Sequence, residues 1–338
     1  MPTDHSHVPI INVAQLVDGS GSISDIARQI DGACRQSGFF YVVEHGVSPR
    51  LIARLVEQSR EFFCQPLTAK QEIAMCRGGR AWRGYFRVGE ELTSGKPDHK
   101  EGLYFGQERP PTDALVAAGT PLHGQNLFPE HPSGLRDTVL EYMDAMTRLA
   151  HRIMVAIALG LGLDQDYFAE HGTRDPLTLF RIFNYPPPAA DDHWGVGEHT
   201  DYGLLTILLQ DDCGGLQVKS GSTWVSAPPV DGSFVCNIGD MLDRMTRGVY
   251  RSTPHRVHNV AGRDRLSFPF FFDPNFFAPV RPIDLPSGEV APDDWGSRWD
   301  KSSVHVFNGT YGDYLLGKVG KVFPELQTQV LRRGDRFG

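Results

Sequence analysis

The sequence lacks a long apolar run, a run of basic residues and any paired-cysteine motif. Every apolar stretch falls short of the ~20 residues that a membrane-spanning helix requires. The first nine residues, Met1 to Pro9, do not show the charged and then apolar pattern of a secretory signal. These absences argue against a membrane protein and against a secreted one.

Cysteines and basic residues are too scattered to define a function. The cysteines form no C-x-x-C pair, and they are Cys34, Cys64, Cys76, Cys213 and Cys236. This pattern is typical of reduced thiols, so we expect a cytoplasmic protein. The net charge of −8, without a cluster of Lys or Arg, argues against a nucleic-acid partner. An anion-binding site must then be local, built from one or two basic side chains.

The 338 residues suffice for one large domain or two closely packed ones, and the first half reads as mostly helical. Apolar residues recur at helical spacing from Ile23 to Ala33 and from Leu51 to Phe62, and they predict a long amphipathic helix from Leu135 to Gly160. The short run Phe39–Val43 predicts a buried strand, and apolar residues from Val304 to Leu331 predict a closing C-terminal helix.

The second half changes to short β-rich runs separated by Gly, Pro and Asp. The main runs cover residues 179–184, 204–209, 216–219, 234–238, 256–260 and 266–272. Many short strands with turn signals between them are typical of a β-barrel or a double-sheet jelly roll. The sequence therefore predicts a mixed α+β fold in which helices precede a β core.

His199 and Asp201 stand just before one of these runs. Two residues apart at an extended strand end, their side chains share a face and can bind one metal ion. A third ligand from a distant strand would complete a two-His-one-carboxylate facial triad, which is the geometry of non-haem Fe(II) oxygenases. The same H-x-[DE] pattern occurs at His99 and Glu101, but in a charged stretch that we expect to face water or to pack.

The third ligand must be a later histidine, and His255, His258 and His305 are the candidates. Downstream of His255, Arg265 and Ser267 alternate on one face of an apolar strand. An arginine can bind a carboxylate through two hydrogen bonds, and the serine hydroxyl can add a third. Because an unpaired arginine in such a strand is costly, a small dicarboxylate whose 2-oxo-acid end reaches the metal is a suitable partner.

Taken in order, these motifs resemble the isopenicillin N synthase-like branch of the Fe(II)/2-oxoglutarate (2OG) dioxygenases. The shared elements in the second half are His199-x-Asp201, His255 in Ser-Thr-Pro-His-Arg-Val, Arg265-x-Ser267, Asn237-Ile238-Gly239-Asp240 and Tyr185-Pro186-Pro187. Those in the first half are Gly38-Phe39-Phe40, His45-Gly46-Val47 and Arg83-Gly84-Tyr85. The resemblance covers nearly the whole chain.

The resemblance implies a double-stranded β-helix, or jelly-roll, core over residues 171–338, which includes the C-terminal helix, and a helical N-terminal cap over residues 1–170. It also implies His199, Asp201 and His255 as the Fe(II) ligands, with 2OG and O2 as cosubstrates. His258 follows His255 by three residues in one strand and faces the opposite side, and His305 lies outside the predicted β core.

The resemblance assigns Tyr185, together with Arg265 and Ser267, to the carboxylate of 2OG. One departure concerns Phe183, which replaces the asparagine that many plant relatives carry two residues before this tyrosine. Alternation along the strand puts Arg181 on the same face, where it meets either an acidic substrate or a salt-bridge partner.

Three further residues are candidates for contact with the substrate. Phe271 shares the inward face of its strand with Ser267 and lines either the substrate pocket or the core. Arg83 and Tyr85 lie in a loop rich in arginine and aromatic residues, through which we expect the N-terminal cap to help form the pocket.

The expected function is the oxidation, by hydroxylation, of a small organic molecule while 2OG and O2 become succinate and CO2. One alternative is an Fe(II) oxidase of the isopenicillin N synthase type that uses no 2OG. Two others are a zinc hydrolase and a non-catalytic jelly-roll binding protein. A zinc site would leave Arg265 without a role, and a complete set of ligands argues against a binding protein. The expected partner is the small-molecule substrate.

Overall fold

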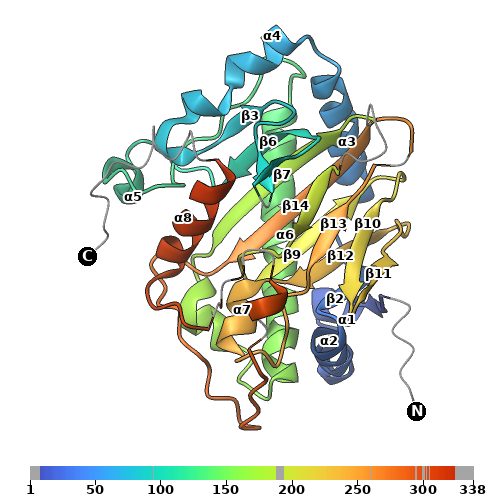
Figure 1. Ribbon diagram of the computed structural model, residues 1–338, viewed down its shortest axis with the longest axis vertical. Helices are drawn as coiled ribbons and strands as arrows, with labels where there is room; N and C mark the ends of the chain where they lie inside the picture. Colours follow the sequence, from blue (N-terminus) through green and yellow to red (C-terminus); the bar gives the residue numbers. More distant parts are fainter. Residues whose placement is uncertain are drawn as a thin grey trace.

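Two β-sheets, one of eight strands and one of four, form the core of the protein (Figure 1). The computed structural model describes residues 8–93, 95–187, 194–259, 261–293, 295–298, 301, 303 and 305–323. The sequence did not distinguish a β-barrel from a double-sheet jelly roll. The two separate sheets are those of a jelly roll. The mixed α+β class is confirmed.

The larger sheet carries the strands that the β-rich runs predicted, with additional strands at both edges. In spatial order its members are β1 (Ile10–Asn12), β2 (Phe39–Val43), β12 (Ser233–Ile238), β9 (Leu205–Gln210), β14 (Arg265–Asp273), β7 (Leu177–Tyr185), β6 (Glu101–Gly106) and β3 (Gly84–Phe86). All neighbours are antiparallel except β1 and β2. This order puts β14 and β7 side by side in the sheet.

The smaller sheet brings together the two segments that contain the predicted histidine ligands. Its strands, in spatial order, are β11 (Thr223–Ser226), β10 (Leu216–Ser220), β13 (His255–Val257) and β8 (Val196–His199). His255 and His199 are register partners across β13 and β8. A two-stranded ribbon, β4 (Leu92–Thr93) with β5 (Lys96–Pro97), lies outside both sheets and contacts β8.

Helices cover the outer face of the larger sheet. The longest is α6 (Leu135–Gly160), which packs on β14 and β9 and is itself contacted by α2 (Ser24–Gln36) and α3 (Pro49–Phe63) (Figure 1). The shorter helices are α1 (Ala14–Asp18), α4 (Leu67–Lys70), α5 (Ala114–Ala117) and α7 (Asp240–Met245). Because period-2 alternation turns Phe268, Phe270 and Phe272 of β14 toward this helical layer, all three are fully buried.

The C-terminal helix α8 (Tyr311–Val322) closes one side of the cavity between the sheets. Thr310 and Asp313 form a capping box at its start, where each side chain accepts a hydrogen bond from the backbone N–H of the other. The sequence predicted a helix within 304–331. Residues 311–322 confirm it, whereas 324–331 lie outside the described residues.

The N-terminal half contributes strands as well as helices. Strands β1, β2, β3 and β6 all precede residue 170, and all four belong to the larger sheet. The sheet therefore continues across the boundary expected near residue 170. Strands β1 and β3 are only three residues long, too short to produce a periodic sequence signal.

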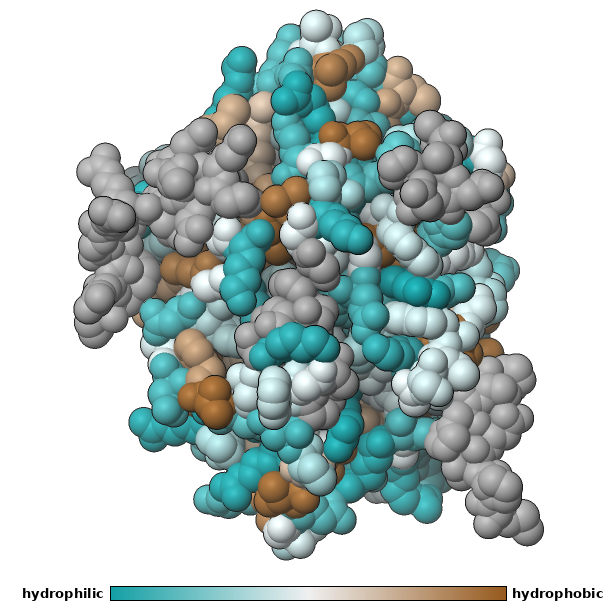
Figure 2. Space-filling model, in the orientation of Figure 1, coloured by the Kyte–Doolittle hydropathy of each residue, from teal (hydrophilic) through white to brown (hydrophobic). Residues whose placement is uncertain are grey.

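Within the part of the chain that the structure describes, no helix is long and apolar enough to cross a membrane. The face drawn in Figure 2 is mostly hydrophilic, with hydrophobic side chains scattered over it. All five cysteines are free thiols.

Candidate active site

His199, Asp201 and His255 come together where β8 and β13 lie side by side. His199 ends β8 and His255 begins β13, so register pairing brings the two imidazoles to a centroid separation of 4.2 Å. The Oδ1 atom of Asp201 lies 3.7 Å from Nε2 of His255 and 3.9 Å from Nε2 of His199. One ligand atom from each residue lies within 4.8 Å of the others, which is close enough to share one metal ion.

Both imidazoles are oriented through their Nδ1 atoms. Nδ1 of His199 lies 2.8 Å from the carbonyl of Gly197, and Nδ1 of His255 lies 3.2 Å from the carbonyl of Thr253. A carbonyl can only accept, so each Nδ1 carries a proton, and Nε2 is the nitrogen of each ring that can bind a metal. Burial, and then the neighbouring His255, lower the pKa of His199 to about 3, which keeps this imidazole neutral near pH 7.

The two carboxylate oxygens of Asp201 have different surroundings. Oδ2 accepts hydrogen bonds from Thr206 (2.6 Å) and from the side-chain amide of Asn237 (2.7 Å), while Oδ1 faces the two imidazoles. Burial alone would raise the pKa of Asp201, but His255, His199 and these two hydrogen bonds lower it. Asp201 is therefore an oriented carboxylate with one oxygen directed toward the histidines. Sequence reasoning missed the role of Asn237, because the contact joins residues 36 positions apart.

Arg265, Ser267 and Tyr185 lie together where β14 pairs with β7. Arg265 is fully buried and is the register partner of Tyr185, whose ring lies 4.9 Å from the guanidinium carbon. Its Nε donates to the carbonyl of Gly214, and its Nη2 contacts Gln210 at 3.4 Å. Nη1 of Arg265 has no hydrogen-bond partner among the described residues. Ser267 and Tyr185 line the cavity, so an anion there would meet a cationic donor that is otherwise unpaired.

The cavity between the sheets contains the metal-binding triad, and it also contains Arg181 and Phe271. Arg181 lies between two rings, 4.0 Å from that of Tyr104 and 5.0 Å from that of Phe271, and its Nη1 is 3.5 Å from Glu91. The predicted shared face of Arg181, Phe183 and Tyr185 is confirmed, since all three line the cavity.

A buried group of charges lies beside Arg181, in a stretch that the sequence suggested would face water or pack. Lys100 forms ion pairs with Asp98 and, at 2.8 Å, with Glu91, and each of the three is less than 5% exposed. Glu91 and Lys100 line the cavity. Of the two outcomes expected for this stretch, packing is the one found for Asp98 and Lys100, because ion pairs compensate their charges and no water is needed. His99 does not belong to the metal-binding group.

Arg83 and Tyr85 do not line the cavity. Arg83 is buried and donates to the carbonyls of Gly124 and Leu122, while the Tyr85 hydroxyl donates to Glu101 over 2.6 Å. These contacts lie within the N-terminal half of the chain, so a role of either residue in substrate binding stays a prediction.

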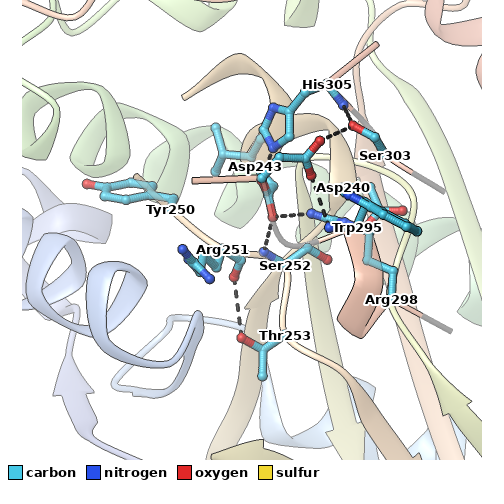
Figure 3. Close-up of polar contacts among 12 residues, drawn as sticks. Asp240, Asp243, Tyr250, Arg251, Ser252, Thr253, Trp295, Arg298, Ser303 and His305 are labelled. Carbon is cyan, nitrogen blue, oxygen red and sulfur yellow. Dashed lines mark hydrogen bonds and ion pairs between the residues drawn. The ribbon is translucent and has the colours of Figure 1, made fainter. Parts of the chain in front are cut away.

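A cluster of ion pairs and hydrogen bonds connects α7 with Ser252, in the segment just before β13 (Figure 3). Oδ2 of Asp243 accepts hydrogen bonds from Nη2 of Arg298 (2.8 Å) and from the backbone N–H of Ser252 (2.9 Å). The other oxygen of Asp243 lies 3.3 Å from Nε2 of His305, and Arg298 also donates to Asp240. His305 is therefore bound outside the triad, as the sequence suggested.

Two imidazoles and one carboxylate, within a jelly roll, define the class of mononuclear non-haem iron oxygenases. Residues 177–274 match the family described as the 2OG-Fe(II) oxygenase superfamily, and residues 8–131 match the one described as non-haem dioxygenase in morphine synthesis N-terminal. A Dictyostelium discoideum protein named "Probable iron/ascorbate oxidoreductase" is 52% identical over 330 residues, covering 90% of this chain and 91% of the relative.

Two further comparisons agree. A homoarginine-6-hydroxylase of Arabidopsis thaliana is 36% identical over 334 residues, covering 94% of this chain and 98% of the relative. The crystal structure of JOX2 in complex with 2OG, Fe and JA superposes with a TM-score of 0.73 at 27% identity, covering 96% of this chain and 89% of the other. The chain belongs to the 2OG-Fe(II) oxygenase superfamily and is an Fe(II)- and 2OG-dependent dioxygenase.

Proposed function

We propose that His199, Asp201 and His255 hold the Fe(II), that Arg265, Ser267 and Tyr185 hold 2OG, and that the enzyme hydroxylates a small organic molecule. The observation that carries this proposal is the unpaired Nη1 of Arg265, a buried cationic donor beside a cavity that also contains the triad. A buried cationic donor without a partner is costly, and an anion bound beside Arg265 would remove that cost.

The residues fit the metal. Two Nε2 lone pairs and one carboxylate oxygen form a facial donor set that leaves other positions for cosubstrate, oxygen and water. The backbone carbonyls and Asn237 fix the orientation of these ligands before metal binds, which is what outer-sphere partners of metal sites generally do. Zinc would also accept such ligands, but zinc chemistry would leave the open donor of Arg265 without a partner.

The residues also fit 2OG. Its distal carboxylate would accept hydrogen bonds from Nη1 of Arg265 and from the Ser267 hydroxyl, and the 2-oxo-acid end would face the triad. Burial raises the pKa of Tyr185, so its hydroxyl stays protonated and can donate to a carboxylate. When bound, iron, 2OG and O2 supply the oxidising chemistry, in which 2OG is converted to succinate and CO2.

The remaining task of the protein is to hold the substrate near the metal and to keep water out. Apolar side chains from three elements support this role: Leu179 of β7, Phe271 of β14 and Leu315 of α8 line the same cavity. Such a lining excludes bulk water from the reacting atoms. Phe271 is our candidate for packing against the body of the substrate. We keep Arg83 and Tyr85 as candidates that act from the N-terminal cap.

The test is metal content combined with cosubstrate dependence. His199→Ala, Asp201→Ala and His255→Ala should each lose Fe(II) and activity, whereas His99→Ala, the second H-x-[DE] motif, should keep its iron. Oxygen consumption should require 2OG and should yield succinate. Full iron occupancy in all three variants would overturn the ligand assignment.

The same assay separates this proposal from the oxidase alternative. An Fe(II) oxidase of the isopenicillin N synthase type would consume oxygen without 2OG and would produce no succinate.

We also keep the cytoplasmic location as a proposal, supported by five free cysteines. Fractionation of cells that express the protein would test it.

A further inference from the structure

Arg181 lines the cavity, and the proposed 2OG site does not use it. Arg181 and Tyr185 lie four residues apart on β7, about 13 Å at the usual rise of a strand. Arg265 stacks on Tyr185, whereas Arg181 lies between Tyr104 and Phe271. A five-carbon dicarboxylate that binds at Arg265 and at the metal therefore leaves Arg181 available to another ligand.

Arg181 is held in place by its neighbours but keeps donors for a ligand. The two rings fix the plane of the guanidinium, and one Nη atom lies 3.5 Å from Glu91, a long contact for a hydrogen bond. The side chain is 17% exposed, against 5% or less for Glu91, Asp98 and Lys100. Arg181 is thus the member of this charged group that is most open to the cavity.

The charges around Arg181 restrict what can bind there. Lys100 and Arg181 are balanced by Glu91 and Asp98, so the group is formally neutral before any ligand arrives. A carboxylate suits the planar donors of Arg181. A bare anion would nevertheless leave one negative charge uncompensated in a buried site, which is costly. A zwitterion adds no net charge, and the carboxylate of Glu91 lies beside Arg181, where an ammonium group would be stabilised.

We propose that the primary substrate is an α-amino acid whose carboxylate binds Arg181, with its ammonium group on the Glu91 side and its side chain directed toward the metal. This inference rests on the proposed function, since it assumes that iron and 2OG occupy the other end of the cavity. Arg181 would then determine specificity and would hold the substrate without ligating the metal.

The experiment is an anaerobic titration of the Fe(II)·2OG protein, read as a change in its visible metal-to-2OG charge-transfer band. The probes are the twenty protein amino acids together with two matched series. One series is L-arginine, 5-guanidinopentanoate, which lacks the α-amino group, and agmatine, which lacks the carboxylate. The other is L-leucine, 4-methylpentanoate and 3-methylbutylamine.

We expect at least one amino acid to perturb the band and amines to leave it unchanged. Within a series that responds, the acid without the α-amino group should bind more weakly. Amines that act like amino acids, or a band that no amino acid perturbs, would overturn the proposal. Acids that bind as tightly as their amino acids would overturn its zwitterionic part.

Arg181→Gln provides the second readout. The affinity for the amino acid should fall roughly 10- to 150-fold, the equivalent of a hydrogen bond to a charged group, while the midpoint for 2OG should not move. Arg148→Gln, on the exposed face of α6, is the control and should change neither. An unchanged amino-acid affinity in Arg181→Gln would contradict the assignment. Absence of any band in the wild-type protein would instead count against the proposed function itself.

Discussion

At the scale of single residues, the site depends on side chains that do not touch the metal. Asn237 and Thr206 bind one oxygen of Asp201 and so leave the other for the histidines. Outer-sphere partners of this kind typically change metal affinity by 10- to 100-fold. We therefore expect Asn237→Ala to weaken Fe(II) binding by roughly that factor.

Direct titration of the apo protein with Fe(II) measures this effect. Asn275→Ala, whose side chain bonds to Asp175 away from the cavity, is the control and should bind iron like the wild-type protein. Equal affinities in Asn237→Ala and the wild-type protein would show that Asp201 keeps its orientation without the hydrogen bond from Asn237.

Arg265 allows a second prediction at this scale. Its open Nη1 is assigned to 2OG, so Arg265→Ala should weaken 2OG binding by about 1.5–3 kcal/mol, or roughly 10- to 150-fold. Arg263→Ala removes an arginine two residues away that pairs with Asp212 at the surface, and it should leave 2OG binding unchanged. Equal losses of 2OG affinity in both variants would mean that the loss comes from removing a positive charge and not from removing a direct contact with 2OG.

Asp273 predicts a pH dependence of stability. It lies in the cavity wall, where burial raises its pKa to about 7, although Tyr311 donates a hydrogen bond to it. A carboxyl whose pKa is higher in the folded than in the unfolded protein favours the folded state when protonated. Asp273 therefore makes its full contribution to the free energy of unfolding below about pH 4, and this contribution is lost as the pH rises toward 7.

Asp273→Asn, which imitates the protonated form, should remove this contribution to the pH dependence. The difference in unfolding free energy between variant and wild type should grow in favour of the variant from pH 4 to pH 7 and then level off. Denaturant unfolding at several pH values measures it. A difference that is constant with pH would show that Asp273 titrates normally.

At the scale of elements, the sequence predicted the long and strongly patterned ones. The helices α2, α3 and α6 and the strands β7, β9, β10, β12 and β14 all match runs that composition and spacing indicated. Strand β6 was missed because it is buried on both faces and reads Glu-Gly-Leu-Tyr-Phe-Gly, without alternation. For Asp98 and Lys100 the sequence could not decide between facing water and packing, since their burial depends on ion pairs that only the fold creates.

For the candidate site too, the sequence predicted the residues in local motifs and missed the contacts that depend on the fold. His199, Asp201, His255, Arg265 and Ser267 belong to short motifs, and the structure brings the first three together as expected. The supporting contacts of Asn237 and Asp243 join elements that are distant in the chain, so no local pattern could predict them.

The cluster around Asp243 supports a prediction at this scale. Asp243 holds the N–H of Ser252, three residues before His255, and is itself held by Arg298 (Figure 3). Arg298→Gln should therefore loosen the turn before His255 and lower Fe(II) affinity, by less than Asn237→Ala does. Arg247→Gln, which removes an exposed contact with Asp284, is the matched control. Iron binding that is unaltered in Arg298→Gln would confine this cluster to a role in stability.

At the scale of the whole molecule, the two sheets place the residues proposed for iron, for 2OG and for the substrate in or beside one cavity. The smaller sheet supplies His199 and His255, and Asp201 follows just after β8. The larger sheet supplies Arg181 in the cavity wall and Arg265 next to the cavity-lining Tyr185, and α8 closes one side. The larger sheet includes strands from the N-terminal half, so that half helps to build the same sheet. This arrangement would allow motifs spread from residue 181 to residue 267 to act together.

The most direct test of the account is an anaerobic titration of the Fe(II) protein with 2OG alone. We expect a visible charge-transfer band that saturates at one 2OG per iron and that is lost in His255→Ala. Admission of oxygen with substrate should then yield one succinate per 2OG consumed. A protein that binds Fe(II) but shows no band, and that consumes oxygen without forming succinate, would contradict the account.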